Sequence, residues 1–126
     1  METSILKSTK KRLGIAPDYT AFDEDVITQI NSAFSDLTQL GVGPAVFVIE
    51  DETADWSDYI TDDDQMLSWV KTFIYLKVRL AFDPPQTSYL ITAMEKQIEQ
   101  LEFRMNVQRE HTEWVDPDPV IVEEVP

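Results

Sequence analysis

Apolar side chains recur at helical spacing in four stretches of the chain, and each stretch predicts a helix. The first is residues 4–13, which Thr3 or Ser4 can cap at its start and Gly14 can end in a left-handed conformation. Its basic residues gather in the last turn, where the helix dipole favours cations. A short helix with one apolar side is therefore expected here.

Residues 23–40 have the clearest helical periodicity of the four stretches. The apolar positions are Val26, Ile27, Ile30, Phe34, Leu37 and Leu40. Asp23 to Asp25 stand where the positive end of the helix dipole favours anions, and Gly41 follows the last periodic residue. We expect an amphipathic helix of about five turns.

Residues 65–82 are apolar on most faces, which is typical of a helix at the centre of a bundle. Asp83-Pro84-Pro85 ends this stretch, because proline lacks a backbone donor and disfavours helix at the residue before it. The fourth stretch, residues 87–109, has a narrower apolar seam. Its members alternate in steps of three and four: Ile91, Met94, Ile98, Leu101 and Met105.

The connection between the second and third helices, residues 42–64, is unusually long. Connections in helical bundles usually run roughly 2–8 residues. This one contains a β-prone piece at residues 46–49 and a predicted single turn around Trp56. Long ordered loops of this kind more often carry function than merely join elements.

The last fourteen residues, EWVDPDPVIVEEVP, combine five carboxylates and three prolines with a β-branched run and no cation. Proline keeps such a chain extended and out of a sheet interior. A lone β-branched strand suits addition to the sheet edge of another protein. The arm residues expected to bind a partner are Trp114, Val115, Pro117, Pro119, Val120, Ile121 and Val122. A disordered acidic end is the alternative.

These elements predict a mainly α, four-helix bundle-like fold with a long, partly extended loop between helices two and three. The chain of 126 residues fits one domain, large enough to bury a core. We expect that helical domain to be residues 1–112, followed by an extended acidic C-terminal arm, residues 113–126.

Charge is distributed very unevenly along the chain. The formal net charge is −14, yet residues 1–12 carry four cations against one carboxylate. Residues 13–70 then contain thirteen Asp and Glu and no Lys or Arg. Such a field repels phosphate, so ordinary affinity for nucleic acid is not expected. The acidic half must stay in water or face basic surface elsewhere, and the N-terminal cations are placed to meet carboxylates of a neighbouring chain.

The residues needed for catalysis are sparse. The chain has no cysteine, a single histidine (His111) and three glycines, which cannot form a Gly-rich phosphate loop. Residues 51–62 place oxygen-bearing side chains at calcium-loop spacing, but Trp56 stands where the sharp turn needs glycine. We therefore predict no enzyme activity, no metal and no cofactor. No stretch is long and apolar enough for a signal peptide or a membrane span.

Several pieces of the sequence, in this order, resemble the head–tail connector proteins of tailed bacteriophages. The pieces are KRLGI, DEDVITQINSAFSDLTQLGVGP, FVIEDETADWSDY and WVKTFIYLKVRLAFDPP. They resemble the small helical adaptors of the gp6/gp15-like type. The resemblance covers roughly residues 4 to 110 and rests on the order and spacing of the pieces rather than on a catalytic signature.

The resemblance implies structural work in the neck of a virion, at the head–tail interface, by a protein made in the host cytoplasm. The resemblance implies a ring of 12 copies under the portal protein, which extends the DNA channel and docks the tail-completion or stopper protein. The arm is expected to bind the portal protein or, failing that, the adjacent subunit. Packaged DNA passes through without specific binding, and no membrane is involved. The residues expected at subunit–subunit contacts are Lys7, Lys10, Lys11, Arg12, Phe47 and Trp56. The acidic candidates for facing the channel are Asp51, Asp55 and Asp58.

Two other kinds of function are weighed against this one. An acidic DNA mimic or inhibitor that occupies a basic site on another protein would explain the charge of −14. It would need carboxylates over its whole surface, however, whereas residues 71–112 are nearly neutral. A metal-dependent hydrolase using the carboxylates of residues 51–64 lacks an organised set of ligands.

Overall fold

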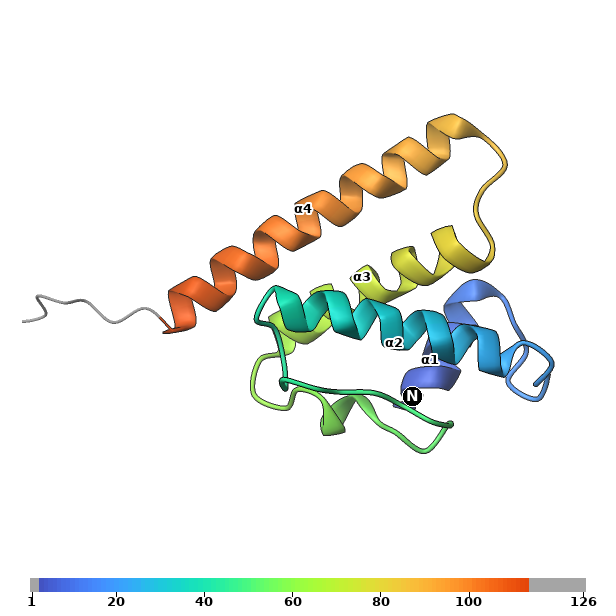
Figure 1. The fold of residues 1–126 in the computed structure, drawn as a ribbon, viewed down its shortest axis with the longest axis horizontal. Helices are drawn as coiled ribbons and strands as arrows, with labels where there is room; N and C mark the ends of the chain where they lie inside the picture. The colour runs from blue at the N-terminus through green and yellow to red at the C-terminus, as the bar shows by residue number, and fades with distance from the viewer. Residues whose placement is uncertain (1–2, 114–126) are drawn as a thin grey trace, which may run out of the picture.

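The computed structural model describes residues 3–113. Four α-helices lie in this part of the chain: α1 (Ile5–Leu13), α2 (Asp23–Gln39), α3 (Asp64–Phe82) and α4 (Ser88–Glu113). A short 3-10 helix, η1 (Trp56–Asp58), lies in the connection between α2 and α3 (Figure 1). The described residues contain no β-strand. The prediction of a mainly α fold with four helices is confirmed.

Local chemistry sets the helix ends close to where the sequence indicates them. Ser4 caps α1, because its hydroxyl oxygen accepts a hydrogen bond of 3.2 Å from the Lys7 backbone N–H. Gly14 ends the helix at a φ of 82°, a left-handed conformation that favours glycine. Asp63 caps α3 in the same way as Ser4, with its carboxylate accepting from the Met66 N–H at 3.0 Å.

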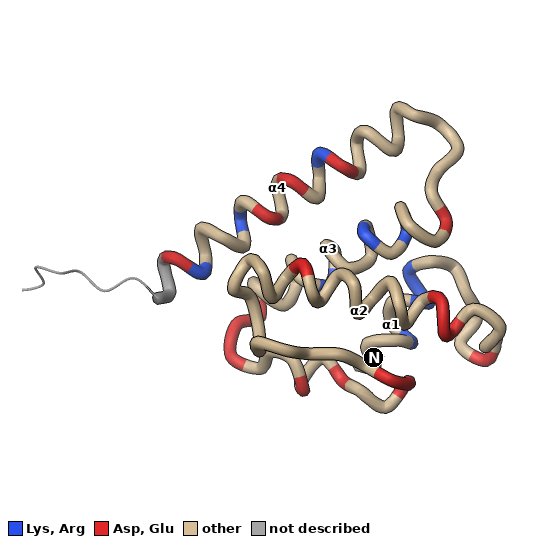
Figure 2. Tube along the Cα trace, viewed as in Figure 1, with Lys and Arg blue, Asp and Glu red and all other residues tan. Residues whose placement is uncertain are grey.

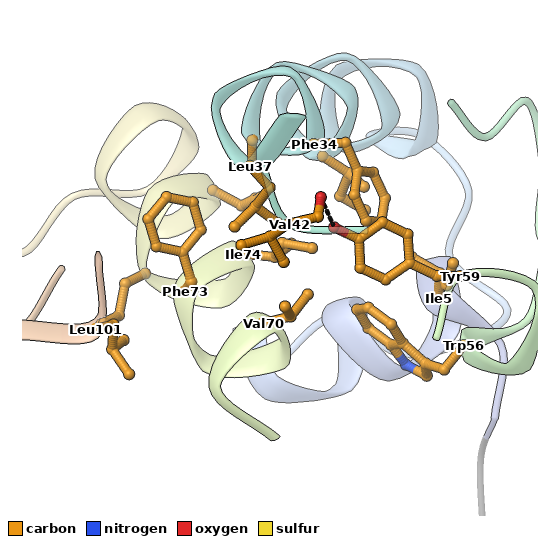
Figure 3. Packing of buried hydrophobic residues seen from close by; sticks show 14 of the residues in the cluster. Ile5, Phe34, Leu37, Val42, Trp56, Tyr59, Val70, Phe73, Ile74 and Leu101 are labelled. Atoms are coloured by element: carbon orange, nitrogen blue, oxygen red, sulfur yellow. Dashed lines mark hydrogen bonds between the residues drawn. The ribbon is translucent and has the colours of Figure 1, made fainter. Parts of the chain in front are cut away.

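The core is built around α3, which contacts each of the other three helices. The buried side chains of α3 are Met66, Val70, Phe73, Ile74, Leu76 and Val78. The close view of the core shows Val70, Phe73 and Ile74 among Ile5 of α1, Leu37 of α2 and Leu101 of α4 (Figure 3). This arrangement is the reason that α3 is apolar on most faces, because a helix covered on several sides has little surface left for water.

α4 is attached to the rest of the molecule mainly through its second half. Ile98, Leu101 and Met105 are buried, as the seam predicts. The first turns stand away from the other helices (Figure 1), and there Tyr89 is 80% exposed. Near the far end, the Gln108 side-chain amide donates to the Asp63 carboxylate at 3.3 Å.

The β-prone piece after α2 forms no strand, although its side chains alternate. Val46 and Val48 are exposed, Phe47 is partly buried and Ile49 is buried. Asn31 of α2 holds the end of this piece through its side-chain amide. Its nitrogen donates to the Ile49 carbonyl at 3.0 Å and its oxygen accepts from the Ile49 N–H at 2.8 Å.

Candidate interaction surfaces

The basic end of α1 was expected to offer four cations to a neighbouring subunit, but Lys10 is only 2% exposed. Its Nζ lies 2.8 Å from Asp23 Oδ1 and donates to the carbonyl oxygens of Tyr19 at 2.8 Å and Pro17 at 3.3 Å. The turn that follows α1 folds back over the side chain and encloses the ammonium group. Lys10, which was expected to contact another subunit, is thus held by partners within its own subunit.

The other three cations of this cluster remain at the surface. Lys11 and Arg12 are exposed, and the Arg12 guanidinium lies 4.5 Å from the centre of the Tyr75 ring. Lys7 is partly exposed, with its Nζ 3.9 Å from a Glu52 carboxylate oxygen. An exposed ion pair of this length contributes little to stability, so these charges are available to a partner.

Trp56 and Phe47 pack inside their own subunit. The Trp56 side chain is 4% exposed, and its indole N–H donates to the Ser8 hydroxyl at 2.8 Å. The Phe47 ring lies 4.9 Å from the Phe34 ring and 5.0 Å from the Tyr59 ring, measured between centroids. Trp56 thus serves loop packing, one of its two expected roles.

The long loop is fastened to the start of α1 by its backbone. The Ile5 N–H donates to the Ala54 carbonyl at 2.9 Å, and the Trp56 N–H donates to the Thr3 carbonyl at 3.1 Å. The Ser4 hydroxyl donates to the Glu52 carbonyl at 2.7 Å. These contacts join segments about fifty positions apart in sequence, so the loop is an ordered part of the fold.

Carboxylates line this loop, and Figure 2 shows no Lys or Arg among them. Asp51 is exposed, and the Thr53 hydroxyl and N–H both donate to its Oδ1, at 2.6 and 2.8 Å. These hydrogen bonds, that of the hydroxyl first, lower the pKa of Asp51. Asp58 accepts from the Asp55 N–H at 2.9 Å. The three candidate channel carboxylates therefore also stabilise local turns.

No group of three or more acidic or histidine side chains in the described part of the chain is arranged to hold a metal ion. The calcium-loop spacing of residues 51–62 is thus used for turns and for η1. The backbone of His111 continues α4. None of the helices within residues 3–113 is long and apolar enough to cross a membrane.

Sequence reasoning did not identify the exposed apolar side chains. On α4, Phe103 is 70% exposed and Val107 is 46% exposed. The two are four positions apart, and they lie on the side of the helix opposite Leu101 and Met105. Their spacing, offset from the heptad seam, was visible in the sequence.

A groove of about 550 Å³ lies between α4 and the pair α2 and α3. Its floor includes Ala33, and its rim carries an ion pair between Lys77 and Asp36 with an N–O distance of 2.9 Å. Glu95 and Glu99 of α4 face the groove from the other side. The predicted arm residues, from Trp114 to Val122, lie outside the described residues.

The fold and these surfaces define a class of protein: a small helical protein whose exposed charge and apolar side chains suit contact with other proteins. The chain matches the family model described as phage connector protein over residues 5–112. It belongs to that family, and the resemblance seen in the sequence is confirmed at this level. No curated protein and no solved structure matches the chain. The family is a structural one, of bacteriophage head–tail connectors, rather than a family of enzymes.

Proposed function

We propose that this protein is a head–tail adaptor of the gp6/gp15-like type, which forms a ring between the portal and the tail-completion protein and extends the DNA channel. The observation that carries the proposal is the family match over residues 5–112. Exposed side chains suited to protein contact lie on more than one face of the subunit, with Lys11 and Arg12 on α1 and Phe103 and Val107 on α4. In a ring, one face of each subunit meets a different face of the next.

The acidic loop is the surface that suits the channel. It carries Asp51, Asp55 and Asp58 with no cation in residues 50–64, and Asp51 and Asp58 are exposed. A channel lined in this way repels the phosphates of passing DNA and gives it no place to bind. Gel shift with duplex DNA at about 150 mM salt should therefore show no retarded band.

The exposed cations at the end of α1 suit subunit or portal contacts. Reversing Lys11 and Arg12 to Glu should leave the melting temperature nearly unchanged, because exposed charges contribute roughly 0–1 kcal/mol each. Assembly should weaken and become more sensitive to salt. Unchanged assembly would mean that these charges are only solvated.

The decisive experiment for the proposed function is assembly with the phage's own portal protein, imaged by electron microscopy. We expect a ring of this protein, of about twelve copies in the arrangement of this family type, seated on the portal. Deleting residues 115–126 tests whether the arm contributes to portal binding. Particles in which the protein neither forms rings nor binds portal or tail-completion protein contradict the proposal.

A further inference from the structure

The segment Val46–Ile49 has the side-chain alternation of a β-strand without a neighbouring strand. Val46 is 85% and Val48 59% exposed, whereas Ile49 is 2% exposed. Phe47 packs against the Phe34 and Tyr59 rings. Side chains that point alternately out and in over successive residues indicate extended backbone, and Figure 1 shows this stretch running alongside α2.

The backbone groups of this segment are used at one residue only. The Asn31 side chain pairs with both the N–H and the C=O of Ile49, as a neighbouring strand would. Among residues 3–113, no hydrogen bond is made by the backbone groups of Val46, Phe47 or Val48. In extended backbone the groups of alternate residues point to the same edge. Ile49 therefore defines the edge facing α2, and Val48 presents its N–H and C=O at the opposite edge, just after the bend that ends at Val46.

We propose that this opposite edge receives residues 120–122 of a neighbouring copy as an added β-strand. The inference rests on the proposed ring, because it requires a second copy beside the first. Main-chain hydrogen bonds to Val48 hold the incoming strand, and the exposed side chains of Val46 and Val48 pack on it. Asn31 and the aromatic contacts of Phe47 keep the acceptor segment extended in advance, which lowers the entropic cost of pairing.

The proposed incoming strand belongs to the part of the chain that follows α4. Residues 114–126 contain Val-Ile-Val preceded by two prolines, a run with high strand propensity. The six residues 114–119 span up to about 20 Å when extended. Figure 1 shows α4 running out past the end of α2, away from the direction in which the acceptor segment runs.

The charges on both sides of this contact predict how its strength depends on salt. Glu50, Asp51 and Glu52 follow the acceptor segment, and Asp118 and Glu123 flank the incoming one. The flanks repel each other, while the pairing itself depends on backbone hydrogen bonds and apolar contact. Added salt should therefore strengthen the contact, because it screens the repulsion. A contact made by ion pairs would weaken instead.

Disulfide trapping tests the proposal directly, since the chain contains no cysteine. Val46→Cys protein is mixed with size-tagged full-length protein carrying Ile121→Cys, and Val120→Cys and Val122→Cys cover the register. We expect a mixed disulfide dimer at several times the yield obtained with Thr28→Cys, an exposed site on α2. The yield should rise between low and about 0.5 M salt, where screening is nearly complete.

A backbone variant separates strand pairing from mere proximity. Val48→Pro in the Val46→Cys protein removes one N–H from the proposed edge and should lower the trapping yield several-fold, whereas Val48→Thr keeps it within about twofold. The melting curves of both variants show whether the fold persists. The proposal is overturned if the trapping yield is no higher than that of Thr28→Cys or falls with salt. It is also overturned if a Val46→Cys/Ile121→Cys variant forms the disulfide only within one chain. Rings that still form on the portal would then leave the proposed function standing.

Discussion

Replacing Lys10 by methionine should destabilise the protein far more than any other single change at the basic end of α1. The Lys10 ammonium is the partner of the Asp23 carboxylate and of two backbone carbonyls. Asp23 Oδ1 is buried and has no other partner among the described residues. Methionine keeps the length of the side chain but leaves that carboxylate oxygen unpaired. Breaking one half of a buried ion pair costs about 3–5 kcal/mol.

The effect is large compared with the stability of a domain, which is typically about 5–15 kcal/mol. The Asp23 side chain keeps 24% of its exposure, so water reduces the loss and we expect about 3 kcal/mol. At about 3–5 °C per kcal/mol for a chain of this size, the melting temperature should fall by about 10–15 °C. Urea denaturation followed by far-UV circular dichroism measures the change in the free energy of unfolding.

Lys11→Met is the matched control, because Lys11 is the next residue in the same helix and is exposed. It should change the free energy of unfolding by less than about 0.5 kcal/mol. Pairing Lys10→Met with Asp23→Leu should recover part of the loss, since no unpaired charge then remains buried. Equal effects of Lys10→Met and Lys11→Met would refute the reasoning and would mean that the enclosed ammonium group contributes no stability.

Three further changes test other parts of the fold. Gly43→Ala should lower the free energy of unfolding by several kcal/mol, because the added Cβ overlaps the Tyr59 ring. Gly14→Ala, which meets nothing within 4 Å, should lower it only by the roughly 1–2 kcal/mol that a left-handed conformation costs alanine, and urea denaturation compares the two variants. Burial raises the pKa of Tyr59, so the stabilisation of the fold by its neutral side chain is complete below pH about 10 and is lost as the pH rises further. Between pH 9 and about 11, the free energy of unfolding of Tyr59→Phe should therefore fall less than that of the wild type. Asn31→Ala should cost about 1–3 kcal/mol, because the buried backbone groups of Ile49 lose both partners, and urea denaturation of the two proteins measures it.

The helices could be predicted from the sequence because their signals are local. The caps Ser4 and Gly14 and the seam of α4 depend on residues a few positions apart, and the structure confirms them. The burial of Lys10 could not be predicted in this way. It depends on how the turn of residues 17–19 closes over α1, and a lysine at the end of a helix is usually exposed.

The candidate surfaces were predicted less completely for the same reason. In the sequence, Trp56 is equally compatible with an interface anchor and with a loop-packing residue, because its role depends on Ser8, forty-eight positions away. The pair of hydrogen bonds between the Asn31 side chain and the Ile49 backbone spans eighteen positions, and no local sequence pattern indicates it. Contacts of this range are set by tertiary packing, which local periodicity does not encode.

α4 is held to the core mainly through its second half, so its first residues can move more than the rest of the helix. Its seam fixes the helix at Ile98, Leu101 and Met105, and Met94 packs partly against the core, so the six residues from Ser88 to Ala93 extend beyond these contacts for about 9 Å. A tilt of about ten degrees of this end moves its first residue by roughly 1.5 Å. A subunit built in this way can adjust the position of the exposed Tyr89 to a neighbour's surface by about that distance, with most of the seam left in place.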